Sequence, residues 1–560
     1  MSESEHRMIE ILRILSQKEK AIGSKVIADE LKEKGYNLGE RAVRYHMQIL
    51  DEKGYTEKKG YSGRIITKLG HEKLEKGLIY DQVDFIHSKF EEIIYLTNFN
   101  YITQKGNVVV NTSTIYNENS IKILKEIISN GLCVSPYVNL KRLPNDEKIE
   151  VTTICGTTID GILLKEGIAS QPQYGGLLKI KNHTPTQFEE LISYKKTSIT
   201  PLDAFATAEN TSIHNVVKKG TGIIPANFRL IPSVGRQKTI DIINKLNKIG
   251  IGGVIAISDE GKDILGIPTP PKMIGIVIIG GITPFCAIQE TGEKIDIKIA
   301  EEIQNFKNLT PITTKITKTL KNTKNKTQPK ISFLLSKTWN MIQQVNFNTN
   351  NKKGNIITNI SYIDKTNLKK AISIMKNTYN ENPQYINPYY KIINHPQNNN
   401  KIGIATICSL SIDGILIKNG IMSTPKYSGL LELTKTPEFI HLISYNGSTV
   451  DPHKIFLSKN MTSITNNNTP KKILASFKEI PYITRDYAVN LLDKINNIGF
   501  SIYKIGKPRE VTYNAKADNY NIGIVAGSGL NPIGAIKEKG INIEIKAIEQ
   551  LMKFEEMKKL

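Results

Sequence analysis

The chain has 560 residues, of which 39% are hydrophobic and 7% aromatic, and its formal net charge is +22. This length predicts three or four domains with packed cores. Because the chain shows neither a signal-peptide pattern nor an apolar run that could span a bilayer, we expect a cytoplasmic protein that does not contact a membrane. Its four cysteines form no C-x-x-C pair, which argues against a zinc ribbon or a redox dithiol.

The first seventy residues predict three short helices followed by a hairpin. Apolar residues recur at helical spacing over 6–15, and Ser24 is placed to cap a second helix that Gly35 would end. A third helix follows a short turn, and the glycine-bearing segment 56–70 is typical of a hairpin. This order predicts a winged helix-turn-helix domain over 1–75, whose third helix enters the major groove of DNA.

The predicted third helix has two different faces. Val43, Met47 and Leu50 form an inward stripe, whereas the opposite face carries two arginines, a tyrosine and a glutamine. Arginine pairs with guanine edges or phosphates, and the wing contacts the backbone or the minor groove. Such a unit could instead mediate protein contacts, but the polar face favours DNA. The predicted DNA-binding residues are Ser24, Lys25, Arg41, Arg44, Tyr45, Gln48 and Arg64.

The rest of the chain is a tandem duplication. The nine residues TICGTTIDG that begin at Thr153 return as TICSLSIDG from Thr406. Between 153–178 and 406–431, 17 of the 26 positions are identical. Weaker matches, NFRLIP against SFKEIP among them, continue on both sides. The sequence therefore predicts one copy at 80–309 and another at 331–560, each of domain size.

More than half of the positive charge excess lies in one stretch. Residues 310–402 hold 15 lysines and two acids, Asp364 and Glu381, which gives a net charge of 15 − 2 = +13. The net charge is therefore weak evidence for nucleic-acid binding and indicates mainly solvated surface. Within this stretch, 310–330 has six lysines and no acid, which predicts an exposed, mobile linker. The segment 81–96 predicts a helix between the DNA-binding domain and the first copy.

The duplicated motif invites a local interpretation. We expect a strand over 150–154, a turn at Asp160-Gly161, a second strand-like segment after it, and a glycine-bearing loop at PQYGGLL. Free backbone N–H groups in such a region could bind a carboxylate or a phosphate. Cys155 and Cys408 could equally be core residues, and the aspartates could only cap a turn. Because residue identities persist between diverged copies, we favour a site or the support of one.

The sequence favours ligand binding without catalysis. A nucleophilic cysteine needs a nearby base, yet no histidine recurs at matching places in the two copies. The chain also has no P-loop and no G-x-G-x-x-G at a strand–helix junction. Arg229 in NFRLIP, matched by Lys478 in SFKEIP, could pair with a ligand carboxylate or could be a surface charge.

The segment GERAVRYHMQILDEKGY (39–55), the paired TIC…DGI…P-x-Y-x-G segments and the NFRLIP element together resemble the NrpR family of archaeal nitrogen-regulation repressors, over essentially the whole chain. The resemblance implies an α+β fold, with an N-terminal winged helix-turn-helix followed by two tandem, homologous α/β-type regulatory domains. It also implies a homodimer or higher homo-oligomer that represses nitrogen-assimilation genes at a palindromic operator and is released by 2-oxoglutarate, without catalytic activity, cofactor or metal.

The same resemblance suggests where the small dicarboxylate binds. Ser409, Leu410 and Lys478 depart from the first copy, which predicts unequal ligand binding by the two copies. The rival hypotheses are a bifunctional enzyme-repressor with a reactive thiolate and a DNA-binding scaffold whose copies bind another protein. The predicted ligand residues are Cys155, Thr158, Asp160, Gly161, Pro172, Tyr174, Gly176 and Arg229 in the first copy, and Cys408, Asp413, Gly414, Pro425, Tyr427 and Gly429 in the second.

Overall fold

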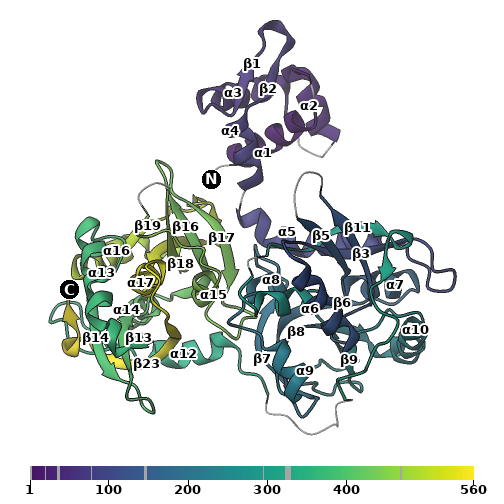
Figure 1. Cartoon of the computed structure of the whole chain (residues 1–560). Coiled ribbons are helices and arrows are strands. Elements are labelled where there is room, and N and C mark those ends of the chain that lie inside the picture. Colours follow the sequence, from purple (N-terminus) through teal and green to yellow (C-terminus); the bar gives the residue numbers. More distant parts are fainter. Residues whose placement is uncertain are drawn as a thin grey trace. The chain divides into compact units, whose positions relative to one another are not determined.

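The computed structural model describes residues 3–18, 20–33, 38–76, 79–143, 148–293, 295–321, 330–466 and 470–560. The chain divides into two compact units, residues 1–82 with 341–442 and 462–560, and residues 83–340 with 443–461. No helix in the described ranges is long and apolar enough to cross a membrane. Figure 1 labels the helices and strands in chain order.

The N-terminal part is the predicted winged helix-turn-helix domain. Its buried core joins Leu12, Leu31, Val43 and Met47 from three helices. The hairpin is shorter than predicted, because the Thr67 hydroxyl accepts the Gly70 amide at 3.0 Å and starts another helix. Gly35, expected to end the second helix, lies outside the described residues. The elements are α1 (Glu3–Ser16), α2 (Ser24–Glu33), α3 (Glu40–Glu52), β1 (Thr56–Lys58), β2 (Arg64–Ile66), α4 (Lys68–Lys76) and α5 (Ile79–Leu96), the last covering the helix expected at 81–96.

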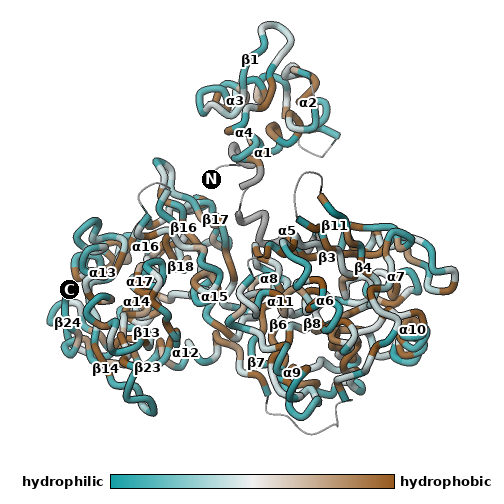
Figure 2. Tube along the Cα trace, viewed as in Figure 1, coloured by the Kyte–Doolittle hydropathy of each residue, from teal (hydrophilic) through white to brown (hydrophobic). Residues whose placement is uncertain are grey.

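The first copy contains two five-stranded antiparallel sheets, in the orders β11-β3-β5-β4-β12 and β7-β6-β8-β10-β9. Figure 2 shows apolar residues along these strands and on the helices between them. The elements are β3 (Asn107–Ile115), α6 (Glu118–Ser129), β4 (Tyr137–Arg142), β5 (Ile149–Ile154), α7 (Thr157–Lys165), β6 (Gln171–Lys181), β7 (Thr184–Ser193), α8 (Pro201–Phe205), α9 (Ile213–Lys219), β8 (Gly222–Pro232), α10 (Arg236–Lys248), β9 (Val254–Ile257), β10 (Met273–Ile279), α11 (Thr283–Gln289), β11 (Ile297–Asn305) and β12 (Thr310–Pro311).

The second copy repeats this design, with sheet orders β23-β13-β15-β14-β24 and β17-β16-β18-β22-β19. Its elements are α12 (Leu334–Gln344), β13 (Asn355–Asp364), α13 (Leu368–Glu381), β14 (Tyr389–Asn394), β15 (Lys401–Ile407), α14 (Leu410–Lys418), β16 (Thr424–Leu433), β17 (Glu438–Ser444), α15 (Pro452–Ser458), β18 (Lys471–Pro481), α16 (Arg485–Ile498), β19 (Ile502–Ile505), β20 (Val511–Thr512), β21 (Ala515–Lys516), β22 (Asn521–Gly527), α17 (Asn531–Glu538), β23 (Glu544–Lys553) and β24 (Lys558–Lys559).

Each copy is itself built from two similar halves. In the first copy the order β3-α6-β4-β5-α7 is followed by the same order, β8-α10-β9-β10-α11. The strand that follows each half pairs with the other half, because β6 lies beside β8 and β11 lies beside β3. The loop after α6 and the loop after α10 therefore occupy equivalent places.

Two local predictions in the duplicated motif are wrong. The expected turn and strand after Cys155 form the helix α7, and the expected glycine loop is the strand β6. Helix α7 is buried from Thr157 to Leu163, so it lacks the polar face that would reveal helical spacing. In β6, a side chain at Gly176 would overlap the Glu190 carbonyl, so the glycine marks close packing rather than a turn.

The predicted linker also differs from the structure in its first half. Thr310–Pro311 form β12, which pairs with β4, so the first copy extends beyond residue 309. The amides of Ile312, Thr317 and Lys321 then donate to carbonyls of the first copy at 3.0, 2.7 and 2.7 Å. This backbone is exposed but fixed along the first copy, and residues 322–329 lie outside the described part.

Candidate functional site

Helix α3 presents the predicted DNA-binding face to solvent. Val43, Met47 and Leu50 are buried, whereas Arg41, Arg44, Tyr45 and Gln48 are exposed. The exposed side chains lie at helical spacing on one side, which suits a recognition helix in a major groove. Lys25 at the start of α2 is exposed as well, and Ser24 is partly buried.

Two of the predicted DNA contacts already have protein partners. Arg44 Nη2 lies 2.6 Å from Glu40 Oε1, and the Ser24 hydroxyl donates to the same oxygen at 3.0 Å. These hydrogen bonds lower the pKa of Glu40. Because Arg44 and Glu40 are both exposed, their ion pair is weak and could yield to a phosphate.

Arg64 is more firmly held than Arg44. Its Nε donates to Asp51 Oδ2 at 2.7 Å, and only 12% of its side chain is exposed. Asp51 also accepts the Thr56 hydroxyl at 2.6 Å, so Arg64 ties the wing to α3. It positions the wing rather than pointing freely from the tip.

The sequence reasoning missed the residue at the tip of the wing. Tyr61 is fully exposed, and Lys58 and Lys59 beside it are exposed. The pattern that could have identified it is a lone aromatic residue between Gly60 and Gly63. A basic, aromatic tip suits contacts with the DNA backbone or the minor groove.

The repeated Asp-Gly and NFRLIP elements meet in a buried ion pair. In the first copy, Arg229 Nε donates to Asp160 Oδ1 at 2.6 Å and Oδ2 at 2.8 Å, and the Ser170 hydroxyl donates to Oδ1 at 2.6 Å. The exposed fractions of the Arg229 and Asp160 side chains are 2% and 0%. Two sequence motifs that were interpreted separately therefore form one structural feature (an aspartate, a serine and a cation).

The second copy builds the same feature with lysine. Lys478 Nζ lies 2.5 Å from Asp413 Oδ2, and the Ser423 hydroxyl donates to Asp413 Oδ1 at 2.7 Å. Both charged side chains are fully buried. A partnered charge pair of this kind is costly to break, because the remaining charge would be buried alone.

The surroundings of the pair explain the change of cation. A side chain at Gly156 would lie 3.4 Å from Arg229 Nη2 and 3.3 Å from the side chain of Ile278. In the second copy Ser409 replaces Gly156 and the shorter Lys478 replaces Arg229. The smaller cation thus occurs in the copy that has the larger residue at this position.

Arg229 keeps one nitrogen free of protein partners. Its Nη1 is buried and has no hydrogen-bond partner among the described residues. Burial disfavours its charged form, but the Asp160 carboxylate holds the pKa of Arg229 above its ordinary value. Burial in turn raises the pKa of Asp160, which Arg229 and Ser170 oppose. We regard the pair as ionised.

The remaining predicted ligand residues lie around this pair in packing positions. Cys155 Sγ lies 3.3 Å from the Thr157 hydroxyl, and burial raises the pKa of this thiol, which disfavours a reactive thiolate. The Thr158 hydroxyl bonds both the amide and the carbonyl of Val109 at 3.0 Å. A methyl group at Gly161 would overlap Thr97. Each of these residues has a structural reason for its identity.

The equivalent residues of β6 and of the second copy behave alike. Tyr174 packs near Phe228, with ring centroids 6.1 Å apart, and Tyr427 near Phe477 at 6.2 Å. Side chains added at Gly414 and Gly429 would overlap Val345 and Phe439. Cys408 is buried, and Pro172 and Pro425 pair in strand register with Arg229 and Lys478.

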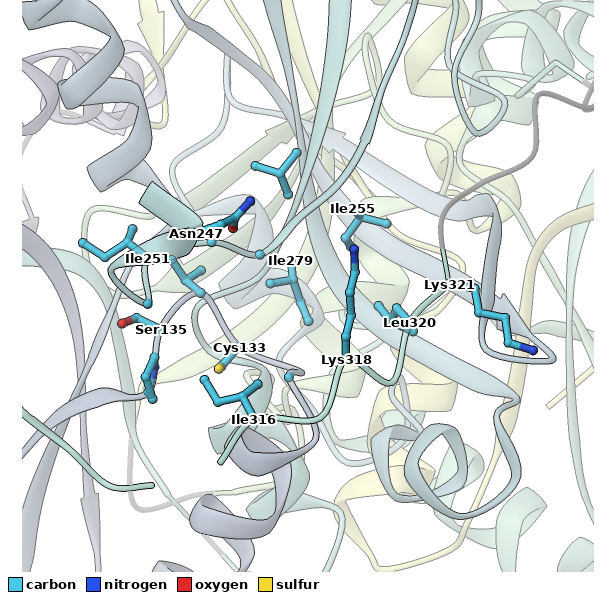
Figure 3. Close-up of a pocket in the computed structure, with 17 residues that line it drawn as sticks. Cys133, Ser135, Asn247, Ile251, Ile255, Ile279, Ile316, Lys318, Leu320 and Lys321 are labelled. Atoms are coloured by element: carbon cyan, nitrogen blue, oxygen red, sulfur yellow. The ribbon is translucent and has the colours of Figure 1, made fainter. Parts of the chain in front are cut away.

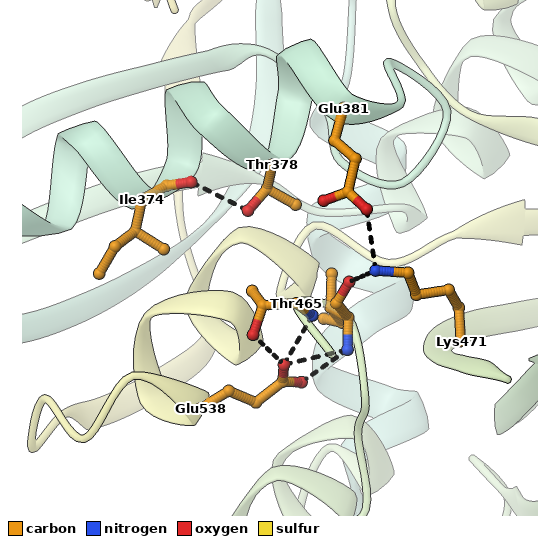
Figure 4. A network of polar contacts seen from close by, with 7 residues as sticks. Ile374, Thr378, Glu381, Thr465, Lys471 and Glu538 are labelled. Carbon is orange, nitrogen blue, oxygen red and sulfur yellow. Dashed lines mark hydrogen bonds and ion pairs between the residues drawn. The ribbon is translucent and has the colours of Figure 1, made fainter. Parts of the chain in front are cut away.

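A further carboxylate recurs at equivalent places in both copies. Glu538 accepts the amides of Ile464 and Thr465 and the Thr465 hydroxyl, each at 2.8 Å. Figure 4 shows the contacts between Glu538 and Thr465. In the first copy Glu290 accepts the Ile213 amide at 2.6 Å and the Thr211 hydroxyl at 2.7 Å. These carboxylates therefore anchor equivalent backbone segments in the two copies.

The first copy contains a cavity outside the predicted motif. Its volume is about 410 Å³, and the loops after α6 and α10, the end of β10 and residues 316–321 line it (Figure 3). Within the described part of the chain, none of the predicted ligand residues lines this cavity. The glycines of IGIGGV (249–254) are the sequence feature that could have indicated it. The described residues also contain no group of three or more His, Cys, Asp or Glu placed to hold a metal.

Two family models match this chain in the order of its domains. The model for "NrpR regulatory domains NRD1 and 2" matches residues 83–311 and 331–559, and the model for the ribonuclease R winged-helix domain matches 9–74. A crystal structure of a nitrogen repressor-like protein from Methanococcus jannaschii is 32% identical and covers 41% of this chain and 99% of that chain, with a TM-score of 0.37.

Curated relatives match over nearly the whole chain. The global nitrogen regulator NrpR of Methanococcus maripaludis is 34% identical over 98% of each chain. The global nitrogen regulator NrpR of Methanocaldococcus jannaschii is 33% identical over 100% of this chain and 98% of its own. With a winged helix followed by two regulatory domains, the chain belongs to the NrpR family.

Proposed function

We propose that this chain represses transcription of nitrogen-assimilation genes by binding a palindromic operator as a dimer, and that 2-oxoglutarate releases it. The observation that carries the proposal is the exposed face of α3 with Arg41, Tyr45 and Gln48, in a chain whose relatives are named global nitrogen regulators. Two such helices on a symmetric dimer would contact two half-sites of a palindrome.

Release requires the effector to have a higher affinity for the state that does not bind DNA than for the state that does. An ordinary allosteric coupling of about 1–3 kcal/mol changes DNA affinity about 5- to 150-fold. The predicted ligand residues of both copies remain part of the proposal as structural support. In it, the buried pairs Asp160–Arg229 and Asp413–Lys478 hold α7 and α14 in place.

The first test concerns the operator and the dimer. Full-length protein is mixed with a promoter duplex that carries a palindrome, and with the same duplex in which one half-site is scrambled. We expect two chains per intact duplex by sedimentation, and an affinity at least about 100-fold lower for the scrambled duplex, since each mismatched base pair costs about 1–3 kcal/mol. Equal binding of single chains to both duplexes would contradict the dimeric repressor.

A further inference from the structure

The cavity of the first copy lies between two equivalent loops. Gly131 and Gly250 end α6 and α10 with φ of +70° and +82°, a backbone conformation that favours glycine. The Gly252 amide then donates to the Val134 carbonyl at 2.7 Å, which joins the loops. A side chain at Gly253 would lie 3.1 Å from the Cys133 carbonyl, so glycine is needed for this approach.

The lining of the cavity combines apolar walls with polar and cationic groups. Aliphatic side chains from both loops and from β9 and β10 form the walls, and Ser135 and Asn247 add hydrogen-bonding groups. Lys318 and Lys321 approach from the segment that follows β12, and Figure 3 shows the Lys318 ammonium pointing toward Ile255. A volume of about 410 Å³ is typical of a small-molecule site, which binds ligand mostly by apolar walls and a few polar groups.

The second copy differs from the first at this place. A cavity of about 10 Å³ lies nearby, lined by Asn387, Phe500 and Gly527 at the equivalent loops and also by Ser409 and Ile412 of the duplicated motif. Strand register shows which residues of the two copies correspond. Ile255 is the bulged residue of β9 opposite β10, and Tyr503 is the bulged residue of β19 opposite β22. A tyrosine therefore stands where the first copy has a cavity-lining isoleucine.

Tyr503 points toward the loop after α13. Its hydroxyl donates to the Gln384 carbonyl at 2.7 Å, and a side chain at Gly527 would lie 2.9 Å from that hydroxyl. Gly527 corresponds to Ile279 of the cavity wall, because each donates its amide to the equivalent loop, Gly527 to Ser501 and Ile279 to Gly253. The tyrosine hydroxyl therefore takes the place of the Ile279 side chain, and its ring lies between β22 and the loop after α13.

A second cavity-lining residue of the first copy is also replaced by a tyrosine in the second copy. Helix α6 ends at Ser129 and α13 at Glu381, and β4 and β14 begin at Tyr137 and Tyr389, so both pairs differ by 252 positions (381 − 129 and 389 − 137). The cavity-lining Cys133 therefore corresponds to Tyr385. Burial raises the pKa of Cys133 to about 12, so this thiol is neutral and does not repel an anion.

We propose that the small dicarboxylate effector binds in this cavity of the first copy, and that each chain carries one effector site rather than two. The inference rests on the proposed function and specifies its site. The lysines suit a carboxylate and the aliphatic walls suit a carbon chain. Because residues 316–321 form one wall and lead on to the second copy, a bound effector would fasten the start of that connection to the first copy.

Calorimetry of the full-length chain with 2-oxoglutarate tests the assignment directly, without DNA. We expect one molecule bound per chain. Ile255→Tyr, which copies the second copy, should weaken binding at least tenfold, and Lys318→Gln should do the same by removing the cation. The matched control is Lys315→Gln, an exposed lysine on the same segment that does not line the cavity, and it should leave affinity unchanged.

The outcomes separate the inference from the proposed function. If Ile255→Tyr fails to fold, as judged by circular dichroism, Lys318→Gln decides. Two molecules bound per chain, or unchanged affinity in the folded variants, would overturn the one-site assignment while leaving 2-oxoglutarate as the effector. If the unaltered chain binds no 2-oxoglutarate, the effector itself is wrong, whatever the variants do.

Discussion

Replacing Arg229 with methionine is expected to lower the free energy of unfolding of the first copy by about 3–5 kcal/mol. Without Arg229, burial would raise the pKa of Asp160 further, and this fully buried carboxyl would keep only the Ser170 hydroxyl as its partner among the described residues. Urea unfolding followed by circular dichroism measures the loss. Because the chain has several domains, we expect the variant to separate an early transition of the first copy from the transition of the second.

Two matched variants show whether charge or volume is responsible. Asp160→Asn combined with Arg229→Met removes both charges and should recover most of the loss. Arg229→Lys combined with Gly156→Ser reproduces the arrangement of Asp413, Ser409 and Lys478 and should cost less than Arg229→Met. If Arg229→Met is as stable as the unaltered chain, the pair does not stabilise the fold and its identity needs another explanation.

Replacing Arg41 with alanine is expected to weaken operator binding about 5- to 150-fold, equivalent to about 1–3 kcal/mol, and to relax sequence preference at one base pair. Arg41 is exposed on α3, so the domain should keep its stability. Lys25→Ala should instead weaken binding to all sequences alike and reduce the dependence on salt, as expected for a phosphate contact.

The control for Arg41 is an arginine on another face of the same domain. Arg13 lies on α1 and pairs with Glu10, so Arg13→Ala removes the same charge away from the proposed DNA surface. Equal losses in Arg13→Ala and Arg41→Ala would indicate general electrostatic attraction and would exclude α3 as the recognition helix.

The sequence alone predicts those elements that a local pattern of apolar and polar residues defines. The stripe of Val43, Met47 and Leu50 predicts α3 because a surface helix separates apolar from polar residues. Helix α7 could not be predicted in this way, because it is buried on all sides. The ion pair between Asp160 and Arg229 could not be predicted for another reason. The two residues are 69 positions apart, and the pairing of β6 with β8 brings their motifs together.

Identity between the two copies does not indicate the cavity. Ile255 and Cys133 of the first copy correspond to Tyr503 and Tyr385, so the residues that open the cavity are those that the copies do not share. The shared residues maintain the fold of both copies. In duplicated domains, residues that differ between the copies can therefore line the binding site, and residues that are identical can maintain the fold around it.

The most direct test of the account follows the anisotropy of a labelled palindromic promoter duplex bound by the full-length chain, at fixed salt, as 2-oxoglutarate is added, with glutarate as the control. The account predicts that 2-oxoglutarate releases the DNA and that glutarate does not. Tight DNA binding that 2-oxoglutarate leaves unchanged would contradict it, and would leave a DNA-binding protein whose cavity serves another ligand.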